Sequence, residues 1–174
     1  SHRTHPMAFR AEPASLSKSV IWRALGGFYA NSGISAWEVV PEYITSNTFI
    51  AKQYAFLLIH YLIDLSRESA VDWDAPVYVL EVGAGTGKLS FLLARKVLKE
   101  NPHLLPCNPD TGKQLAVKFI VSDFTDSMVT WWKSNGHFTA EQWGDDLLLA
   151  KFNAATWTAD QGLAVTSLGE PDSS

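Results

Sequence analysis

The sequence is poor in cysteine, in charge and in long apolar runs. Cys107 is the only cysteine, so the chain forms no internal disulfide and no cysteine-based metal site, and its five histidines show no metal-ligand spacing. Only 18% of the residues are charged, the net charge is −4, and no Lys/Arg cluster suits nucleic acid or an anionic membrane. The most apolar stretch, Tyr54 to Leu65, is interrupted by His60 and Asp64 and is too short to span a membrane. These absences predict a cytoplasmic protein with neither a metal site nor a membrane segment.

Apolar residues are plentiful enough to build a core, at 47% of a chain whose length suits one domain. Residues 1–16 are mixed and polar and are predicted to form a flexible arm. Residues 17–70 are expected to form an N-terminal helical region, with one helix over Ser17 to Ala30, broken near Gly26-Gly27, and a second from Ser46 or Asn47 to about Arg67. Apolar residues nearly encircle the second helix, which predicts that most of it is buried. Residues 71–174 are expected to form an α/β domain.

A predicted strand, a glycine-rich turn and a predicted helix follow one another from Val77 to Lys99. The first six residues, Val77 to Val82, are apolar apart from Glu81 and rich in β-branched side chains, as in a buried parallel strand. Apolar residues after the turn recur at helical spacing. Between them lie Gly83, Gly85 and Gly87, which permit positive φ and close approach of a ligand to the backbone. Since the free N–H groups of the helix face the same place, the arrangement predicts a nucleotide-cofactor site.

Three motifs compete to explain the glycine turn. A phosphate-binding P-loop needs glycine and serine or threonine where Val82 and Leu89 stand. A dinucleotide-binding fingerprint needs a third glycine where Lys88 stands. The remaining pattern is Glu81, one spacer, and then Gly-x-Gly-x-Gly. This pattern resembles the first motif of class I S-adenosylmethionine-dependent methyltransferases.

Two further predicted strands end in polar residues. The strand over Leu115 to Ser122 ends at Asp123, where a carboxylate in such folds holds a ribose. Asp123 lies 36 residues after Gly87 instead of about 20, and a Pro-rich surface insertion explains the excess. The strand over Leu147 to Phe152 is followed by Asn153, where the methyltransferase family commonly has an acidic residue that meets the adenine amino group. An amide oxygen accepts the same hydrogen bond.

The resemblance implies S-adenosyl-L-methionine as the cofactor and a role for each matching residue. The glycines would surround its methionine moiety, Glu81 would meet the ammonium group, Asp123 the ribose, Phe124 the adenine face and Asn153 the adenine edge. Three aromatic residues before the second helix, Tyr29, Trp37 and Tyr43, would cover the cofactor. The expected cofactor-binding residues are therefore Glu81, Gly83, Ala84, Gly85, Gly87, Asp123, Phe124 and Asn153.

The resemblance also implies a Rossmann-like α/β sandwich with strand order 3-2-1-4-5-7-6. Only the first three strands are found, so residues 71–174 are expected to form a partial cofactor-binding domain with strand order 3-2-1, preceded by the N-terminal helices. The only candidate for a fourth strand, beside the glycine-motif strand, is Leu163 to Leu168. An open apolar strand edge invites pairing. We therefore expect further polypeptide or a partner chain to complete the sheet, and no function as a lone monomer.

The implied function is methyl transfer to an acceptor that the sequence does not identify, with a small molecule or a protein favoured over nucleic acid. No catalytic residue is assigned. Two alternatives stay open: a non-catalytic, methyltransferase-like scaffold or partner subunit, and a nicotinamide-dependent oxidoreductase, against which Lys88 argues. Other chemically suggestive residues have simpler explanations. His60 is better explained as a helix surface position and Cys107 as a surface thiol. Trp131 and Trp132 are better explained as packing residues.

Overall fold

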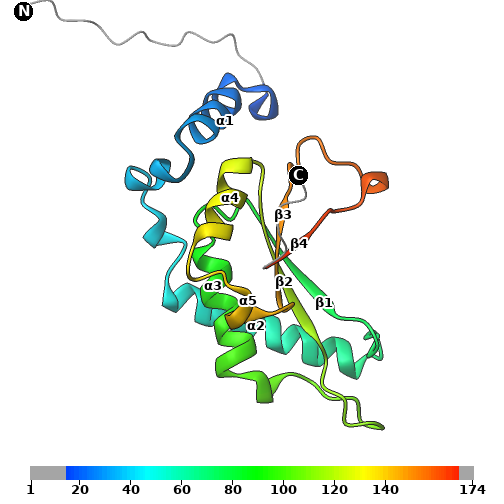
Figure 1. Ribbon diagram of the computed structural model, residues 1–174. Coiled ribbons are helices and arrows are strands. Elements are labelled where there is room, and N and C mark those ends of the chain that lie inside the picture. Colours follow the sequence, from blue (N-terminus) through cyan, green and yellow to red (C-terminus); the bar gives the residue numbers. More distant parts are fainter. Residues whose placement is uncertain (1–14, 169–174) are drawn as a thin grey trace, which may run out of the picture.

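The computed structural model describes residues 15–168, which form an α/β fold around an open four-stranded sheet (Figure 1). The strand order is β1-β2-β3-β4. The first three strands are parallel, and the fourth is antiparallel to β3. The predicted 3-2-1 order of parallel strands is confirmed. The strands are β1 (Val77–Val82), β2 (Val117–Asp123), β3 (Leu147–Lys151) and β4 (Thr166–Ser167).

The candidate fourth strand lies at the β3 edge of the sheet and not beside β1, where the sequence analysis considered it. Thr166 and Ser167 pair with Leu149 and Leu148 of β3, after Gly162 has turned the chain with a φ of 65°. Because this segment follows β3 closely, it folds back on β3 and does not reach β1. Within the described residues, the outer edge of β1 therefore has no partner strand.

The N-terminal region is helical, as predicted. Its first long helix is continuous through Gly26 and Gly27, so the predicted break there is wrong. The second begins after Asn47, whose Oδ1 accepts a hydrogen bond from the Ile50 N–H at 2.9 Å, which confirms one of the two predicted caps. The elements are η1 (Leu16–Lys18), α1 (Val20–Ser32), η2 (Gly33–Glu38), η3 (Glu42–Ile44) and α2 (Thr48–Arg67), where η1 to η3 are 3₁₀ helices.

The prediction that α2 is mostly buried is wrong. Its buried side chains form one face, which packs on the helix after β1 and on the segment beyond it. Within the described residues, several apolar side chains elsewhere on the helix are largely uncovered, and Phe49, Leu57 and Tyr61 are 69%, 65% and 56% exposed. The four buried residues are Ala51, Ala55, Ile59 and Leu62.

The remaining helices connect the strands. The helix after the glycine turn starts at Lys88 and widens into a π-helical segment after Ala94. The helix predicted over Ser127 to Asn135 is found one residue earlier at both ends. The elements are α3 (Lys88–Ala94), η4 (Arg95–Glu100), η5 (Pro102–Leu104), α4 (Asp126–Ser134), α5 (Ala140–Trp143) and η6 (Ala159–Gln161).

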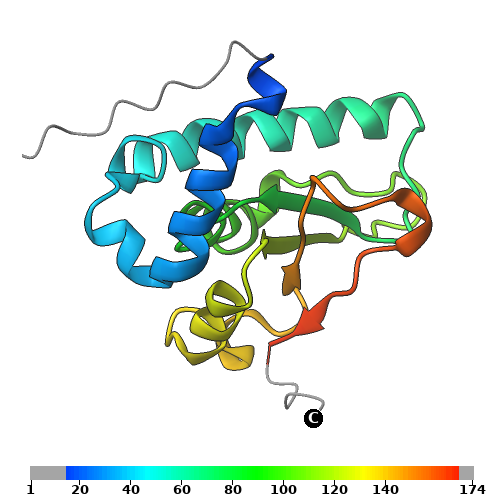
Figure 2. The same ribbon diagram turned by 90° about the horizontal axis from the view of Figure 1, so that it is seen from above.

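The two faces of the sheet are covered unequally, as Figures 1 and 2 show. Helices α2, α3 and α4 lie on one face, where they enclose the main core around Phe119, Val121 and Leu149. The other face carries a small cluster in which Leu163, from the segment after β3, packs against Ile120 and Leu148. As far as the described residues go, nothing covers the β1 end of that second face, where Tyr78, Leu80 and Val82 are 41–54% exposed. Within residues 15–168, no helix combines the length and apolarity that crossing a bilayer requires.

Candidate functional site

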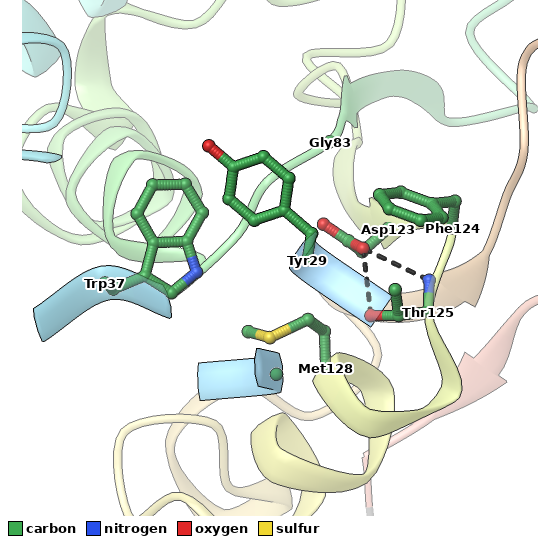
Figure 3. Close-up of a pocket in the computed structure, with 8 residues that line it drawn as sticks. Tyr29, Trp37, Gly83, Asp123, Phe124, Thr125 and Met128 are labelled. Atoms are coloured by element: carbon green, nitrogen blue, oxygen red, sulfur yellow. Dashed lines mark hydrogen bonds between the residues drawn. The ribbon is translucent and has the colours of Figure 1, made fainter. Parts of the chain in front are cut away.

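A cavity of about 250 Å³ lies at the carboxyl ends of β1 and β2 (Figure 3). In open parallel sheets, ligands bind outside this end of the strands. The cavity is mainly apolar, and Asp123 is the only charged residue among those that line it. The lining residues are Tyr29, Gly33, Trp37, Gly83, Asp123, Phe124, Thr125 and Met128.

Asp123 ties the end of β2 to the glycine turn. Its Oδ2 accepts a hydrogen bond from the Gly85 N–H at 3.2 Å, and its Oδ1 accepts from the N–H and the hydroxyl of Thr125, both at 3.1 Å. The side chain is nearly buried. A carboxylate offers about four lone-pair sites, so these three donors leave about one free for a ligand. Asp123 therefore has two roles available, holding the turn and accepting one further hydrogen bond.

All three glycines of the turn have positive φ: 70° at Gly83, 56° at Gly85 and 72° at Gly87. Their surroundings differ. A Cβ at Gly83 would have no heavy atom within 4 Å, whereas a Cβ at Gly85 would lie 2.2–2.8 Å from the ring of Trp37. A Cβ at Gly87 would lie 2.7 Å from the ring of Phe138. Gly83 thus borders open space at the cavity, and the other two glycines admit close aromatic packing.

Two aromatic residues from the N-terminal region cover the cavity. Tyr29 comes from α1 and Trp37 from η2, and their ring centroids are 5.7 Å apart. Figure 3 shows them opposite Asp123 and Phe124, with Met128 between the two sides. The sequence analysis expected these two rings to cover the cofactor, and both line the cavity. Tyr43, predicted with them, is 67% exposed and does not line the cavity.

Glu42 holds the outer side of the glycine turn. One carboxylate oxygen accepts a hydrogen bond from the Thr86 hydroxyl at 2.5 Å, and the other lies 3.3 Å from the Lys88 Nζ. Glu42 belongs to η3, so these contacts connect the segment before α2 to the turn. Nothing in the sequence pattern marked Glu42, because its partners lie more than 40 residues away.

Glu81 points away from the cavity. Its carboxylate accepts a hydrogen bond from the Ser90 hydroxyl of α3, and it lies in a shallow groove on the helix-covered side of β1. Burial raises the pKa of Glu81 above its usual value of 4.5, although the hydrogen bonds from Ser90 oppose the change. The structure therefore does not bring Glu81 together with Asp123 at the cavity.

The raised pKa predicts that Glu81→Gln stabilises the protein at neutral pH. Above pH 4.5 the folded chain holds the Glu81 proton more strongly than the unfolded chain, so the parent loses stability as pH rises through the folded pKa. Glutamine avoids that loss and still accepts the Ser90 hydrogen bond. Thermal melts from pH 4.5 to neutral should show a gain for the variant that grows with pH. Glu38→Gln, at an exposed position, is the control. If the melting temperatures of Glu81→Gln and the parent change in parallel with pH, the prediction is contradicted.

The other predicted site residues divide between the cavity and its surroundings. Phe124 lines the cavity. Ala84, within the turn, donates its N–H to the Ser122 carbonyl at 2.9 Å and does not line the cavity. Asn153 is exposed and does not line the cavity, and its Oδ1 accepts from the Ala155 N–H at 3.0 Å, which caps a turn after β3. Asp123, Phe124 and Gly83 are therefore the predicted residues that share the cavity.

The sequence analysis did not predict that Trp132 supports the glycine turn. The Trp132 Nε1–H donates to the Gly85 carbonyl at 3.1 Å, and the ring is fully buried against Phe138. A tryptophan at an inward helix position signals packing, but its polar partner is not visible in a sequence. Thr125 and Met128 also line the cavity and were not predicted, although both lie within five residues of Asp123.

The cavity offers a buried carboxylate, a glycine whose lack of a side chain leaves room for a ligand, and a mainly apolar lining. Such a set is chemically suited to a ligand that combines a hydroxyl-bearing part with a flat or apolar part. Among residues 15–168, no group of three His, Cys, Asp or Glu side chains is arranged to hold a metal ion. Searches with this chain of protein-family models, of curated proteins and of solved structures find no match.

Proposed function

We propose that this chain binds S-adenosyl-L-methionine in the cavity beneath Tyr29 and Trp37 and takes part in methyl transfer. The observation that supports this proposal is the hydrogen bond between the Gly85 N–H and Asp123. It joins the glycine turn after β1 to the acidic end of β2, the two features from which the sequence resemblance was drawn. The β3-β2-β1 order is compatible with a Rossmann-like fold.

The residues present fit part of this cofactor. The remaining lone pair of Asp123 would accept one ribose hydroxyl, Phe124 and Met128 would contact apolar parts, and Gly83 leaves room for the methionine end. The cavity, at about 250 Å³, lies below the roughly 300–1,000 Å³ of typical ligand pockets. Trp37 fills the space over Gly85. Full binding therefore requires the Trp37 ring to move from its present position.

The chain's own contribution to the reaction would be positioning. When bound, the cofactor supplies an activated methyl group on a good leaving group. Residues of the cavity would hold and orient it, while Tyr29 and Trp37 would exclude water. Of the described residues that line the cavity, the one charged side chain is engaged with the turn. We therefore expect the methyl acceptor, a small molecule or a protein, to bring its own nucleophile into contact with the cavity.

Calorimetric titration with S-adenosylmethionine, and separately with NAD, tests the proposal. Gly83→Val should weaken S-adenosylmethionine binding by about tenfold or more, because the new side chain would project into the cavity. Gly112→Val is the matched control. Gly112 also has positive φ, 71°, and open space around its Cβ position, but it lies in a distant loop. Both variants carry similar backbone strain, so only the loss of ligand space differs.

Three results would count against the proposal. Equal binding by the Gly83→Val variant and the parent would show that the cavity is not the site. Tighter binding of NAD would favour the oxidoreductase alternative. Absence of binding to a folded parent chain would leave the scaffold interpretation as the better one.

A further inference from the structure

A second cavity, of about 440 Å³, lies beside the glycine turn and the start of α3. Its volume falls within the roughly 300–1,000 Å³ of typical ligand pockets. It shares no lining residue with the cavity that contains Asp123. Its walls come from η3, from the turn with α3, and from α4 with the segment that follows it. Because no residue of β1 lines the second cavity, its shape does not depend on what pairs with the free edge of that strand.

The apolar part of its lining is built from aromatic rings that hold one another in place. Phe138 is 5% exposed, and its ring meets that of Phe91 at 6.2 Å and an angle of 71°. Phe91 in turn meets Trp143 edge to face at 5.6 Å. Leu92 and Trp131, both partly buried, complete the apolar lining. Since edge-to-face packing fixes the rings, this part of the lining keeps its shape and favours a flat apolar ligand.

The polar part of the lining has more unused donors than acceptors. The two carboxylate oxygens of Glu42 accept from the Thr86 hydroxyl and from the Lys88 ammonium. That ammonium has three donors, and the ion pair uses one of them. The Asn135 Oδ1 accepts from the His137 N–H at 2.9 Å, which identifies its Nδ2 as the donor end. Within residues 15–168, that Nδ2 and the ring nitrogens of His137 hydrogen-bond to no other protein group.

We infer that the second cavity binds a small aromatic carboxylate. The flat body of this ligand would lie against the rings of Phe91 and Trp131, and its carboxylate would accept hydrogen bonds from Lys88 and Asn135. A carboxylate suits these donors because it is planar, carries one charge and accepts up to about four hydrogen bonds. The inference does not rest on the proposed cofactor, because the two cavities share no lining residue.

The charges around the second cavity disfavour two other classes of ligand. A cationic ligand would need the Glu42 carboxylate, which Lys88 already neutralises at 3.3 Å. A phosphate dianion would bring more negative charge than one lysine, shared with Glu42, can offset. A single negative charge on an aromatic body is what remains, with Lys88 placed between the ligand and Glu42.

NMR titration of the ¹⁵N-labelled chain with cinnamate tests this inference. The indole N–H signal of Trp131 and the side-chain amide signal of Asn135 should move together as cinnamate is added. A dissociation constant of about 1 mM or lower is expected for a ligand of so few atoms. The indole signal of Trp37, in the cavity that contains Asp123, should stay in place. Cinnamyl alcohol keeps the flat body without the charge and should bind about tenfold more weakly.

Two substitutions should change cinnamate binding in opposite directions. Lys88→Met should weaken it about tenfold, because the charged donor is lost. Glu42→Gln should strengthen it about twofold to fivefold, because Lys88 is released from its ion pair while glutamine still accepts from Thr86. Lys99→Met is the matched control. The Lys88 and Lys99 side chains are both 44% exposed and both face a carboxylate, but Lys99 pairs with Asp146 outside the cavity. Circular dichroism melts verify that each variant is folded.

Four outcomes would overturn the inference. The first is the absence of any shift at Trp131 and Asn135 up to about 10 mM cinnamate, well above the affinity expected for its size. The second is a shift confined to Trp37, which would place cinnamate in the other cavity. The third is weaker binding by Glu42→Gln, which would mean that the cavity does not select a negative charge. The fourth is an equal loss for Lys99→Met and Lys88→Met, which would reduce the effect to the overall charge of the protein.

Discussion

Replacing Gly85 with alanine is expected to lower the free energy of unfolding by about 2–5 kcal/mol. About 1–2 kcal/mol comes from the left-handed backbone, since φ is 56° at this position. The rest, about 1–3 kcal/mol, comes from overpacking, because the new methyl group would lie within 2.2–2.8 Å of the Trp37 ring. Urea denaturation followed by circular dichroism measures the change. The sequence alone suggested that this space belongs to a ligand, but here the Trp37 ring occupies it.

Gly83→Ala is the matched control for this prediction. It has a similar backbone conformation, φ 70°, but open space around the Cβ position, so only the backbone cost of about 1–2 kcal/mol applies. Adding Trp37→Ala to Gly85→Ala should recover the steric part of the loss, since the clash is removed. Equal losses for Gly83→Ala and Gly85→Ala, with no recovery in the double variant, would show that Trp37 does not pack on the turn.

Asp123→Ala is expected to cost about 3 kcal/mol of stability or more, because hydrogen bonds to a charged group contribute about 1.5–3 kcal/mol each. The substitution removes the acceptor of three donors, the Gly85 N–H and two groups of Thr125, and leaves them in a nearly buried place. Ligand affinity should also fall, by roughly tenfold to a hundredfold for one lost ribose contact. Denaturation gives the first quantity, and calorimetry on the folded variant gives the second.

Asp126→Ala is the control for Asp123→Ala. Asp126 is exposed in the first turn of α4 and pairs with Lys151 at 2.6 Å, an exposed ion pair that contributes at most about 1 kcal/mol. Its removal should leave ligand affinity unchanged. A larger stability loss for Asp126→Ala than for Asp123→Ala would mean that Asp123 does not hold the turn.

The α/β class and the parallel strand order were predictable because their signals are local. Apolar runs rich in β-branched residues mark β1 and β2, and a run of leucines marks β3. The positions at which β1 and β2 end carry the glycine turn and Asp123. Asn47 signals the start of α2 through its own side chain. Such features depend on a few neighbouring residues, so one sequence is enough to find them.

The burial of α2 was not predictable because it depends on what lies opposite each side of the helix. The pattern of apolar residues shows that nearly every side of α2 could be buried. It does not show that only the side with Ala55 and Leu62 faces other elements of this chain. The same reason explains β4, whose pairing with β3 is set by the turn at Gly162 and not by its own composition.

The candidate site was predictable in part. The backbone positions around Gly83 and the carboxylate of Asp123 follow from the ends of adjacent parallel strands, and they do share a cavity. The spacing of residues in the sequence could not predict where the Glu81 and Asn153 side chains point, because a hydrogen bond holds each of them away from the cavity. Trp132 could be placed on a helix but not under the turn.

The weak attachment of the cavity's cover has a kinetic consequence. None of the residues of α1 is buried, and Ile21 and Trp22 are about half exposed, yet this helix carries Tyr29 and leads directly to Trp37. Segments with few buried contacts open at low free energy. Access of a ligand to Asp123 would then be governed by the opening of α1 and η2 rather than by diffusion, and ligand release would be governed by the same motion. If the proposed ligand binds here, the N-terminal helix would set the rate at which the site fills, whereas the glycine turn and β2 would set the affinity.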